Sequence, residues 1–245
     1  MPADVTAVQF TVHGGGHTLV GLYDIAGTPA PAPFALLLHG IPGSEKNHDL
    51  AHALRARGWN VLVLHFSGTW GSGGLYDIAS HPRDASAAID FALSPNAPAQ
   101  IDARNIVVIG YSFGSRAALF TAYQDPRVTA VISIGGFADF SEVMFDRSFY
   151  ESVSPFLNGT TPDSLIAQLN TLGGGLQPYE VVEQLTVPTL IVHGDADEVV
   201  PFYNALALAG KRADVAVVEG ANHVFGDHRP QLIAAVTEFM AEITP

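Results

Sequence analysis

Three side chains in this sequence could together turn a serine hydroxyl into a nucleophile: Ser112, His223 and Asp197. A serine hydroxyl reacts poorly at neutral pH, so it needs an imidazole as its base and a carboxylate that holds and charge-balances the imidazole. Such a set attacks the carbonyl carbon of carboxylic esters and amides. The sequence supports this chemistry only if its folded elements bring the three side chains together.

Ser112 lies in the pattern Gly110-Tyr111-Ser112-Phe113-Gly114, between an apolar β-branched run and an alanine-rich stretch. The order strand, sharp turn and helix is typical of a nucleophilic serine on a strained turn, where flanking glycines avoid steric collisions. The pattern alone is weak, because a chain with 24 glycines in 245 residues contains it by chance about one time in ten. Whether Ser112 is a nucleophile therefore depends on whether the sequence also supplies a base and an acid.

His223 follows an apolar run at 213–218 that is expected to form a strand. A loop at the carboxyl end of that strand lies at the same edge of a parallel sheet as Ser112. The chain order serine, acid, histidine also places the base here. We therefore expect His223 to be the general base.

Three carboxylates compete for the role of the acid in the loop after the expected strand 189–192. Asp197 is preferred, because it lies in the middle of the loop, clear of the end of the strand. Asp195 is expected to cap the turn after Gly194, and Glu198 is expected to face solvent.

An oxyanion hole requires two backbone N–H groups that point at the developing negative charge. Phe113, directly after the serine at the start of a helix, is expected to supply one. The loop 39–43 ends the first expected parallel strand and should supply the other. Pro42 has no N–H to donate, which leaves Ile41 as the expected donor.

The remaining histidines fit structural roles better than catalytic ones. His39 and His193 each precede a glycine at a strand end and are expected to be structural, and no acidic residue stands at ligand spacing around His13 and His17, which argues against a metal site. Four further histidines are expected to face solvent on helices: His48, His52, His81 and His228.

Apolar runs alternate with helix-compatible stretches along most of the chain, which predicts an α/β fold with a mostly parallel, doubly wound sheet. Expected strands span 5–12, 18–25, 34–38, 60–66, 106–111, 128–134, 189–192 and 213–218. Expected helices span 47–57, 82–93, 162–172, 202–209 and 230–243, besides the one after Ser112. The first two strands, separated by 13–17, read as an antiparallel hairpin.

Residues 137–186 interrupt the alternation and contain no good strand. They read as a small helical cap inserted into a single domain, 1–245, at the sheet edge where such folds bind ligands. Because the segment is rich in aromatic residues, it could supply an apolar substrate pocket. The candidate pocket residues are Trp70, Phe137, Phe140, Met144, Phe145 and Phe149.

Composition narrows the class of protein further. The formal net charge is −13 and no block of lysine or arginine occurs, which argues against nucleic-acid and membrane-surface partners and favours a small-molecule substrate. The absence of cysteine excludes disulfides, zinc-thiolate sites and a cysteine nucleophile. The N-terminus shows no secretory signal and no apolar run is long enough to span a bilayer, so a cytoplasmic location is expected.

Four motifs in this order resemble those of the α/β-hydrolases over nearly the whole chain: His39-Gly40-x-Pro42-Gly43, Gly110-Tyr111-Ser112-Phe113-Gly114, His193-Gly194-x-x-Asp197-x-x-Val200-Pro201 and Asn222-His223. Two further stretches, 42–47 and 70–74, resemble the esterase and dienelactone-hydrolase-like branch, which lies near the prolyl-oligopeptidase-type peptidases. One departure is Ser67, where many such relatives carry arginine.

The resemblance implies a cofactor-free serine hydrolase that cleaves carboxylic esters of small to medium acyl or aromatic substrates. The same triad would also serve an amidase or exopeptidase, and a hydrolase fold could be retained for ligand binding with little turnover. The sequence leaves the acyl length and the oligomeric state open.

Overall fold

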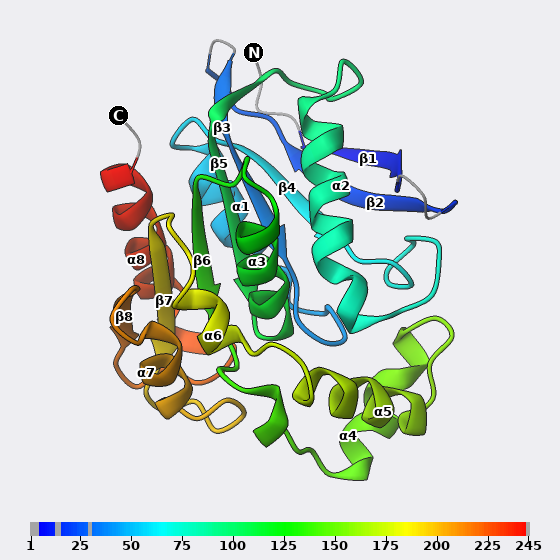
Figure 1. Ribbon diagram of the computed structural model, residues 1–245. Helices are drawn as coiled ribbons and strands as arrows, with labels where there is room; N and C mark the ends of the chain where they lie inside the picture. Colours follow the sequence, from blue (N-terminus) through cyan, green and yellow to red (C-terminus); the bar gives the residue numbers. More distant parts are fainter. Residues whose placement is uncertain (1–4, 13–15, 29–30, 244–245) are drawn as a thin grey trace.

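The computed structural model describes residues 5–12, 16–28 and 31–243. Within them, eight strands form one sheet in the order β1-β2-β4-β3-β5-β6-β7-β8 (Figure 1). Their bounds are β1 (Val5–Thr11), β2 (Thr18–Asp24), β3 (Ala32–Leu38), β4 (Asn60–His65), β5 (Ile101–Tyr111), β6 (Ala130–Ile134), β7 (Thr189–Gly194) and β8 (Asp214–Val218). β2 pairs antiparallel with β1 and β4, and the other pairs are parallel.

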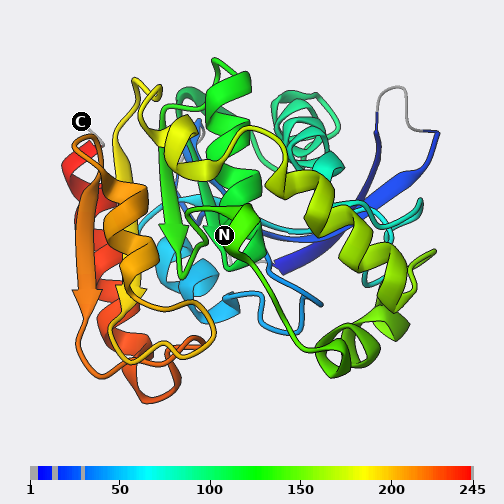
Figure 2. The same cartoon turned by 60° about the horizontal axis from the view of Figure 1, so that its bottom comes forward.

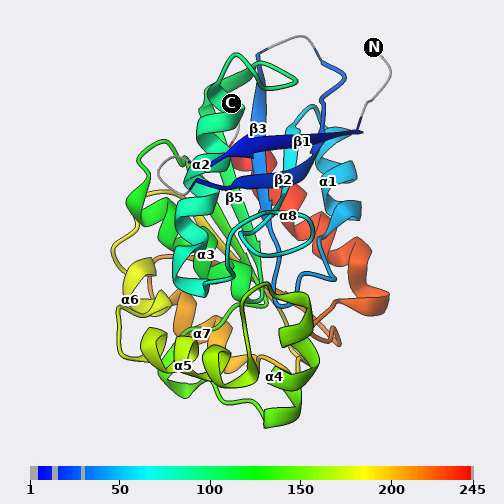
Figure 3. The same cartoon turned by 90° about the vertical axis from the view of Figure 1, so that its right-hand side faces the viewer.

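Helices cover both faces of this sheet (Figure 3). α1 (His48–Arg55) and α8 (Arg229–Ile243) pack on one face, and α2 (His81–Leu93), α3 (Phe113–Gln124), α6 (Pro178–Val182) and α7 (Tyr203–Ala209) pack on the other. The sequence of β3 shows why: Phe34, Leu36 and Leu38 enter one apolar core, and the alternate residues Ala35 and Leu37 enter the other. A strand buried on both faces needs such a continuous apolar run.

The expected fold class is confirmed, including the N-terminal antiparallel hairpin. Residues 13–15 of the hairpin turn lie outside the described residues. The largest difference in bounds is that β5 begins at Ile101 rather than at residue 106. Its first part is polar and half exposed, so the apolar pattern marked only the buried end, although Ile101 already pairs with Ala32 of β3.

The cap, residues 137–186, contains no strand, as expected. Its helices α4 (Arg147–Val153) and α5 (Pro162–Gly173) lie beyond the carboxyl ends of the parallel strands (Figures 1 and 2), whereas its last helix, α6, packs on a face of the sheet. The Thr161 side chain accepts a hydrogen bond from the Ser164 amide and so caps α5. An apolar cluster joins the cap to Phe113 at the start of α3, so the cap packs directly against the helix that follows Ser112.

His81 corrects one expectation. It was predicted to face solvent, but it is 2% exposed at the start of α2. Its ring stacks on Phe66 at 3.8 Å between centroids and meets Tyr76 edge-on, because the loop before α2 folds over the first turn of the helix. Burial holds the pKa of His81 well below its usual range. His52 is exposed as expected, and no helix among the described residues is long and apolar enough to cross a membrane.

Candidate active site

Ser112 lies at the turn between β5 and α3, with φ 54° and ψ −122°. The two glycines of its motif are there for steric reasons. A Cβ on Gly110 would lie 2.1 Å from the Gly114 carbonyl oxygen, and a Cβ on Gly114 would lie 2.3 Å from the Leu38 carbonyl oxygen. Since both neighbours are backbone atoms, the turn can form only with glycine at these positions.

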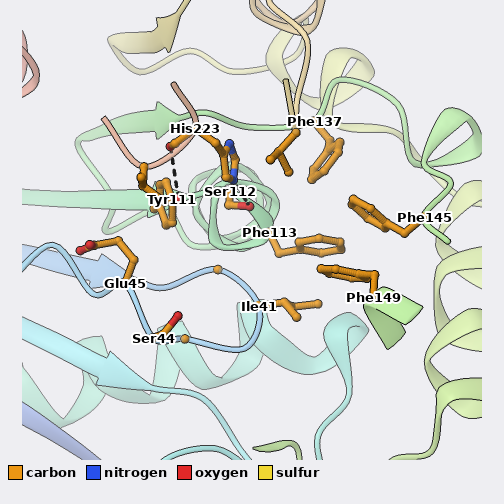
Figure 4. Close-up of a pocket in the computed structure, with 14 residues that line it drawn as sticks. Ile41, Ser44, Glu45, Tyr111, Ser112, Phe113, Phe137, Phe145, Phe149 and His223 are labelled. Atoms are coloured by element: carbon orange, nitrogen blue, oxygen red, sulfur yellow. Dashed lines mark hydrogen bonds between the residues drawn. The ribbon is translucent and has the colours of Figure 1, made fainter. Parts of the chain in front are cut away.

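The structure brings Ser112, His223 and Asp197 together from three different loops. His223 Nε2 lies 3.0 Å from Ser112 Oγ, and His223 Nδ1 lies 2.7 Å from Asp197 Oδ2. The Tyr111 hydroxyl also donates a hydrogen bond of 3.2 Å to the His223 carbonyl oxygen (Figure 4). Tyr111 therefore links the serine turn directly to the loop that carries His223.

Asp197 is buried and well supplied with donors. Its Oδ1 accepts hydrogen bonds from the Val199 and Val200 amides at 2.9 and 2.8 Å. Burial alone raises the pKa of Asp197, but hydrogen bonds from His193 and His223 outweigh burial and hold this pKa well below its usual range. Because the carboxylate is ionised, it accepts a hydrogen bond from His223 Nδ1–H, which leaves the lone pair of His223 Nε2 free to accept the Ser112 proton.

The competing carboxylates lie elsewhere. Glu198 is exposed, as expected. Asp195 is also exposed. Its Oδ1 accepts a hydrogen bond of 2.6 Å from the Gly220 amide, which lies in the loop after β8 and not in the turn that Asp195 was expected to cap. Asp195 therefore joins the β7 and β8 loops and does not contact the imidazole of His223.

His39 and His193 are buried and hydrogen-bonded to backbone carbonyls. His39 Nδ1 donates to Gly40 O at 2.7 Å, and His193 Nε2 donates to Val200 O at 2.8 Å. Burial lowers the pKa of His39 to about 3, so this imidazole stays neutral. These contacts agree with the structural roles expected for both residues.

The loop 39–43, called the oxyanion loop below, lies against the serine. A Cβ on Gly40 would lie 2.9 Å from Ser112 Cβ. Ile41 and Phe113 both line the cavity beside Ser112. Within the described part of the chain, no protein acceptor is bonded to the backbone N–H of either residue. Both amides are therefore available to a ligand.

A cavity of about 180 Å³ opens beside Ser112. Figure 4 shows Phe113, Phe137, Phe145 and Phe149 on one side of the serine, with Glu45 on the other. The cavity is lined by Gly40, Ile41, Gly43, Ser44, Glu45, Tyr111, Ser112, Phe113, Phe137, Phe145, Phe149, Val199, His223 and Val224. One end is therefore aromatic and the other polar.

Of the six candidate pocket residues, Phe137, Phe145 and Phe149 line this cavity. Phe140 is buried inside the cap instead, and Met144 is 87% exposed. Trp70 lies in the loop after β4 and is not among the lining residues. Composition of the cap indicated an aromatic pocket, but it could not show which rings face inward.

Sequence reasoning also missed part of the site. The Phe113 side chain lines the cavity together with the cap phenylalanines, although only its amide was considered. Next to the site, Lys46 is half-buried with its Nζ 4.0 Å from the centroid of the Trp70 ring. The described residues contain no group of three histidine, aspartate or glutamate side chains that could hold a metal ion.

Comparisons with known proteins agree with this architecture. A family model described as the prolyl oligopeptidase family matches residues 50–244. The 2,6-dihydropseudooxynicotine hydrolase of Paenarthrobacter nicotinovorans is 28% identical over 180 residues, which cover 70% of this chain and 46% of that protein. The quorum-quenching protein AidA of Acinetobacter baumannii (strain MDR-ZJ06) is 36% identical over 118 residues, 46% of this chain and 38% of that protein. The matched region thus spans less than half the length of either relative.

Solved structures match over nearly the full chain. The α/β hydrolase GrgF from Penicillium sp. sh18 superposes with a TM-score of 0.77 at 18% identity and covers 98% of both chains. Est1E from Butyrivibrio proteoclasticus, solved with ferulic acid bound, also gives 0.77, at 22% identity over 96% of this chain and 98% of that one. These matches show that the chain has the α/β-hydrolase fold.

Proposed function

The chain belongs to the prolyl oligopeptidase family, and on that premise we propose that it is a serine hydrolase that cleaves carboxylic esters with small to medium acyl or aromatic groups. One observation carries the proposal: an unbroken line of hydrogen bonds runs from Asp197 through His223 to Ser112 Oγ beside a cavity. This line ends at a hydroxyl on a strained turn, which is the geometry of an activated nucleophile.

In the acylation step, Ser112 Oγ attacks the ester carbonyl carbon while its proton passes to His223 Nε2. Asp197 remains ionised and stabilises the imidazolium that forms. The negative charge collects on the former carbonyl oxygen, where the free N–H groups of Ile41 and Phe113 can donate to it. When the tetrahedral intermediate collapses, the bond to the alcohol oxygen breaks and His223 returns its proton to that oxygen.

In the deacylation step, a water molecule takes the place of the alcohol. His223 Nε2 removes a proton from this water as its oxygen attacks the acyl carbon. The second tetrahedral intermediate releases the carboxylic acid and returns the proton to Ser112 Oγ. Besides the ester and water, the proposed cycle uses only side chains and backbone amides of this chain.

The phenylalanine side of the cavity supports the proposed substrate class. Phe137 and Phe145 meet edge-on at 6.1 Å between centroids, and Phe145 stacks on Phe149 at 4.2 Å. Together with Phe113, these rings form a neutral, apolar wall of the cavity. Such a wall favours an uncharged aliphatic or aromatic group, and a cavity of about 180 Å³ favours a group of modest size.

An amidase or exopeptidase is the second candidate, and membership of a peptidase family favours it. Both reactions would use the same Ser112, His223 and Asp197. Matched ester and anilide substrates with the same acyl group separate them. We expect kcat/KM to be higher for the ester, and a clear preference for the anilide would reverse the order of the two candidates.

The test of the proposed function is hydrolysis of p-nitrophenyl esters from acetate to octanoate by the wild type and by Ser112→Ala. Loss of the nucleophile should lower kcat by about 10⁴ to 10⁶. A fluorophosphonate probe should label the wild type at Ser112 and leave the variant unlabelled. Hydrolysis by Ser112→Ala at the wild-type rate would disprove the mechanism, and an unlabelled, inactive wild type would favour a ligand-binding protein that keeps the fold without turnover.

A further inference from the structure

Trp70 adopts a strained backbone conformation outside the cavity. It has φ 45°, in the left-handed region, although it is a bulky residue that is 41% exposed. A bulky residue keeps this conformation only where its surroundings enforce it, and such conformations cluster at functional sites. Ser112 also has a positive φ, which is explained by the tight turn between β5 and α3. Trp70 is not part of that turn, so its backbone conformation must have another cause.

Four groups from three parts of the chain hold Trp70 in place. Its indole Nε1–H donates to the Pro42 carbonyl at 2.6 Å, and its own carbonyl accepts a hydrogen bond from His65 Nδ1 at 2.9 Å. Its ring stacks on Phe156 of the cap, with centroids 6.1 Å apart and planes 15° apart. Lys46 Nζ lies over the ring. An exposed side chain with this many contacts is fixed in orientation.

The hydrogen bond to Pro42 reaches the oxyanion loop directly after Ile41. On the other side of Ile41, His39 Nδ1 donates to the Gly40 carbonyl. The Gly40 carbonyl and the Ile41 N–H belong to one planar trans peptide, so holding the carbonyl points the N–H in the opposite direction. Trp70 and His39 thus hold the loop on both sides of Ile41, which lines the cavity.

We propose that Trp70 is a positioning residue for the oxyanion loop, acting through its indole N–H on Pro42, while the stack on Phe156 fixes the indole against the cap. The inference rests on the proposed function, in which the Ile41 amide stabilises the oxyanion. An amide that is poorly aimed weakens binding of the transition state more than binding of the uncharged ester.

The test is Trp70→Phe, which keeps an aromatic ring for Phe156 and Lys46 but removes the donor. Removal of an oxyanion donor itself lowers kcat by about 10²–10³, so a donor that is only misaligned should lower kcat on p-nitrophenyl butyrate by about tenfold, with KM within about twofold. The inhibition constant of butylboronic acid, which forms a tetrahedral adduct with a catalytic serine, should rise by about the same factor. Tm should change little, because the side chain is partly exposed.

Two further variants serve as controls. Trp59→Phe changes the other tryptophan of the chain, which is 5% exposed in the core away from the site, and should leave kcat unchanged. Phe156→Leu loosens the stack but keeps the indole donor of Trp70, so kcat should fall by less than about threefold. A loss in Phe156→Leu as large as that in Trp70→Phe would show that packing, and not the N–H, carries the effect.

Wild-type kcat and wild-type boronate affinity in a folded Trp70→Phe would overturn the inference while the proposed function stands. A loss of kcat that follows a loss of Tm, with boronate affinity unchanged, would also overturn it in favour of a structural role. A wild type that neither hydrolyses esters nor reacts with fluorophosphonate would overturn the proposed function and this inference together.

Discussion

Asp197→Asn tests the hydrogen-bond line at its buried end, and the structure predicts which way the new amide will face. Asp197 Oδ1 accepts two backbone N–H groups, from Val199 and Val200. An NH₂ group at this position would meet two donors, so the asparagine oxygen must stay there. The NH₂ group is then forced into the place of Oδ2, facing His223 Nδ1 at 2.7 Å.

This orientation reverses the tautomer of His223. The asparagine NH₂ can only donate, so His223 Nδ1 must become the acceptor and the ring proton must move to Nε2. An Nε2–H cannot accept the Ser112 proton. We therefore expect kcat to fall by about 10⁴, or roughly 5.4 kcal/mol in the activation barrier. The fold should persist, because the oxygen keeps both backbone hydrogen bonds.

The assay is kcat on p-nitrophenyl butyrate, together with ¹⁵N NMR of the His223 ring, which distinguishes the two tautomers. Asp195→Asn is the matched control, since Asp195 is exposed and an amide oxygen can still accept from Gly220; its kcat should stay within about twofold. The reasoning is refuted if folded Asp197→Asn keeps more than about a hundredth of wild-type kcat, or if its His223 still carries the proton on Nδ1.

Two further predictions concern the substrate wall and stability. Phe149→Ala removes a ring from the cavity wall, so the ratio of kcat/KM for p-nitrophenyl octanoate to that for butyrate should rise by about tenfold; an unchanged ratio would show that Phe149 does not limit acyl length. His81→Phe should raise the free energy of unfolding in urea by about 1 kcal/mol at pH 7, because both ring nitrogens of His81 are buried without a partner among the described residues. The pKa of His81 is held well below its usual range, so as the pH falls from 7 to 5 the unfolded state binds the proton first and the advantage of the variant should grow; a variant less stable than the wild type would contradict this account.

Residue types and order determined much of the fold. The apolar run Phe34–Leu38 must be covered on both faces, which requires a sheet between two helical layers, and the structure has that arrangement. The glycines at 110 and 114 mark a turn that larger residues cannot enter, and the structure gives the steric reason for each. Local signals sufficed for these features because the cause, burial or collision, acts over a few neighbouring residues.

The same local signals failed where burial depends on distant parts of the chain. His81 stands on a helix with polar neighbours, and only the loop that folds over it with Phe66 and Tyr76 makes it a core residue. Likewise, Phe140 and Met144 have apolar side chains that would suit a substrate pocket. In the structure, however, Phe140 is buried within the cap and Met144 is exposed to solvent.

By itself, the sequence determined which chemical groups the chain offers and in what order they come: a serine on a tight turn, an acid and a histidine, each after an apolar strand. Only the tertiary structure decided which of them meet. The contact between His223 and Ser112 joins residues 111 positions apart, and the indole of Trp70 reaches Pro42 from a separate loop. Parallel strands bring their carboxyl ends to one edge of the sheet. Distances of about 3 Å between side chains, however, depend on how the loops and helices pack, and this packing cannot be predicted from local sequence patterns.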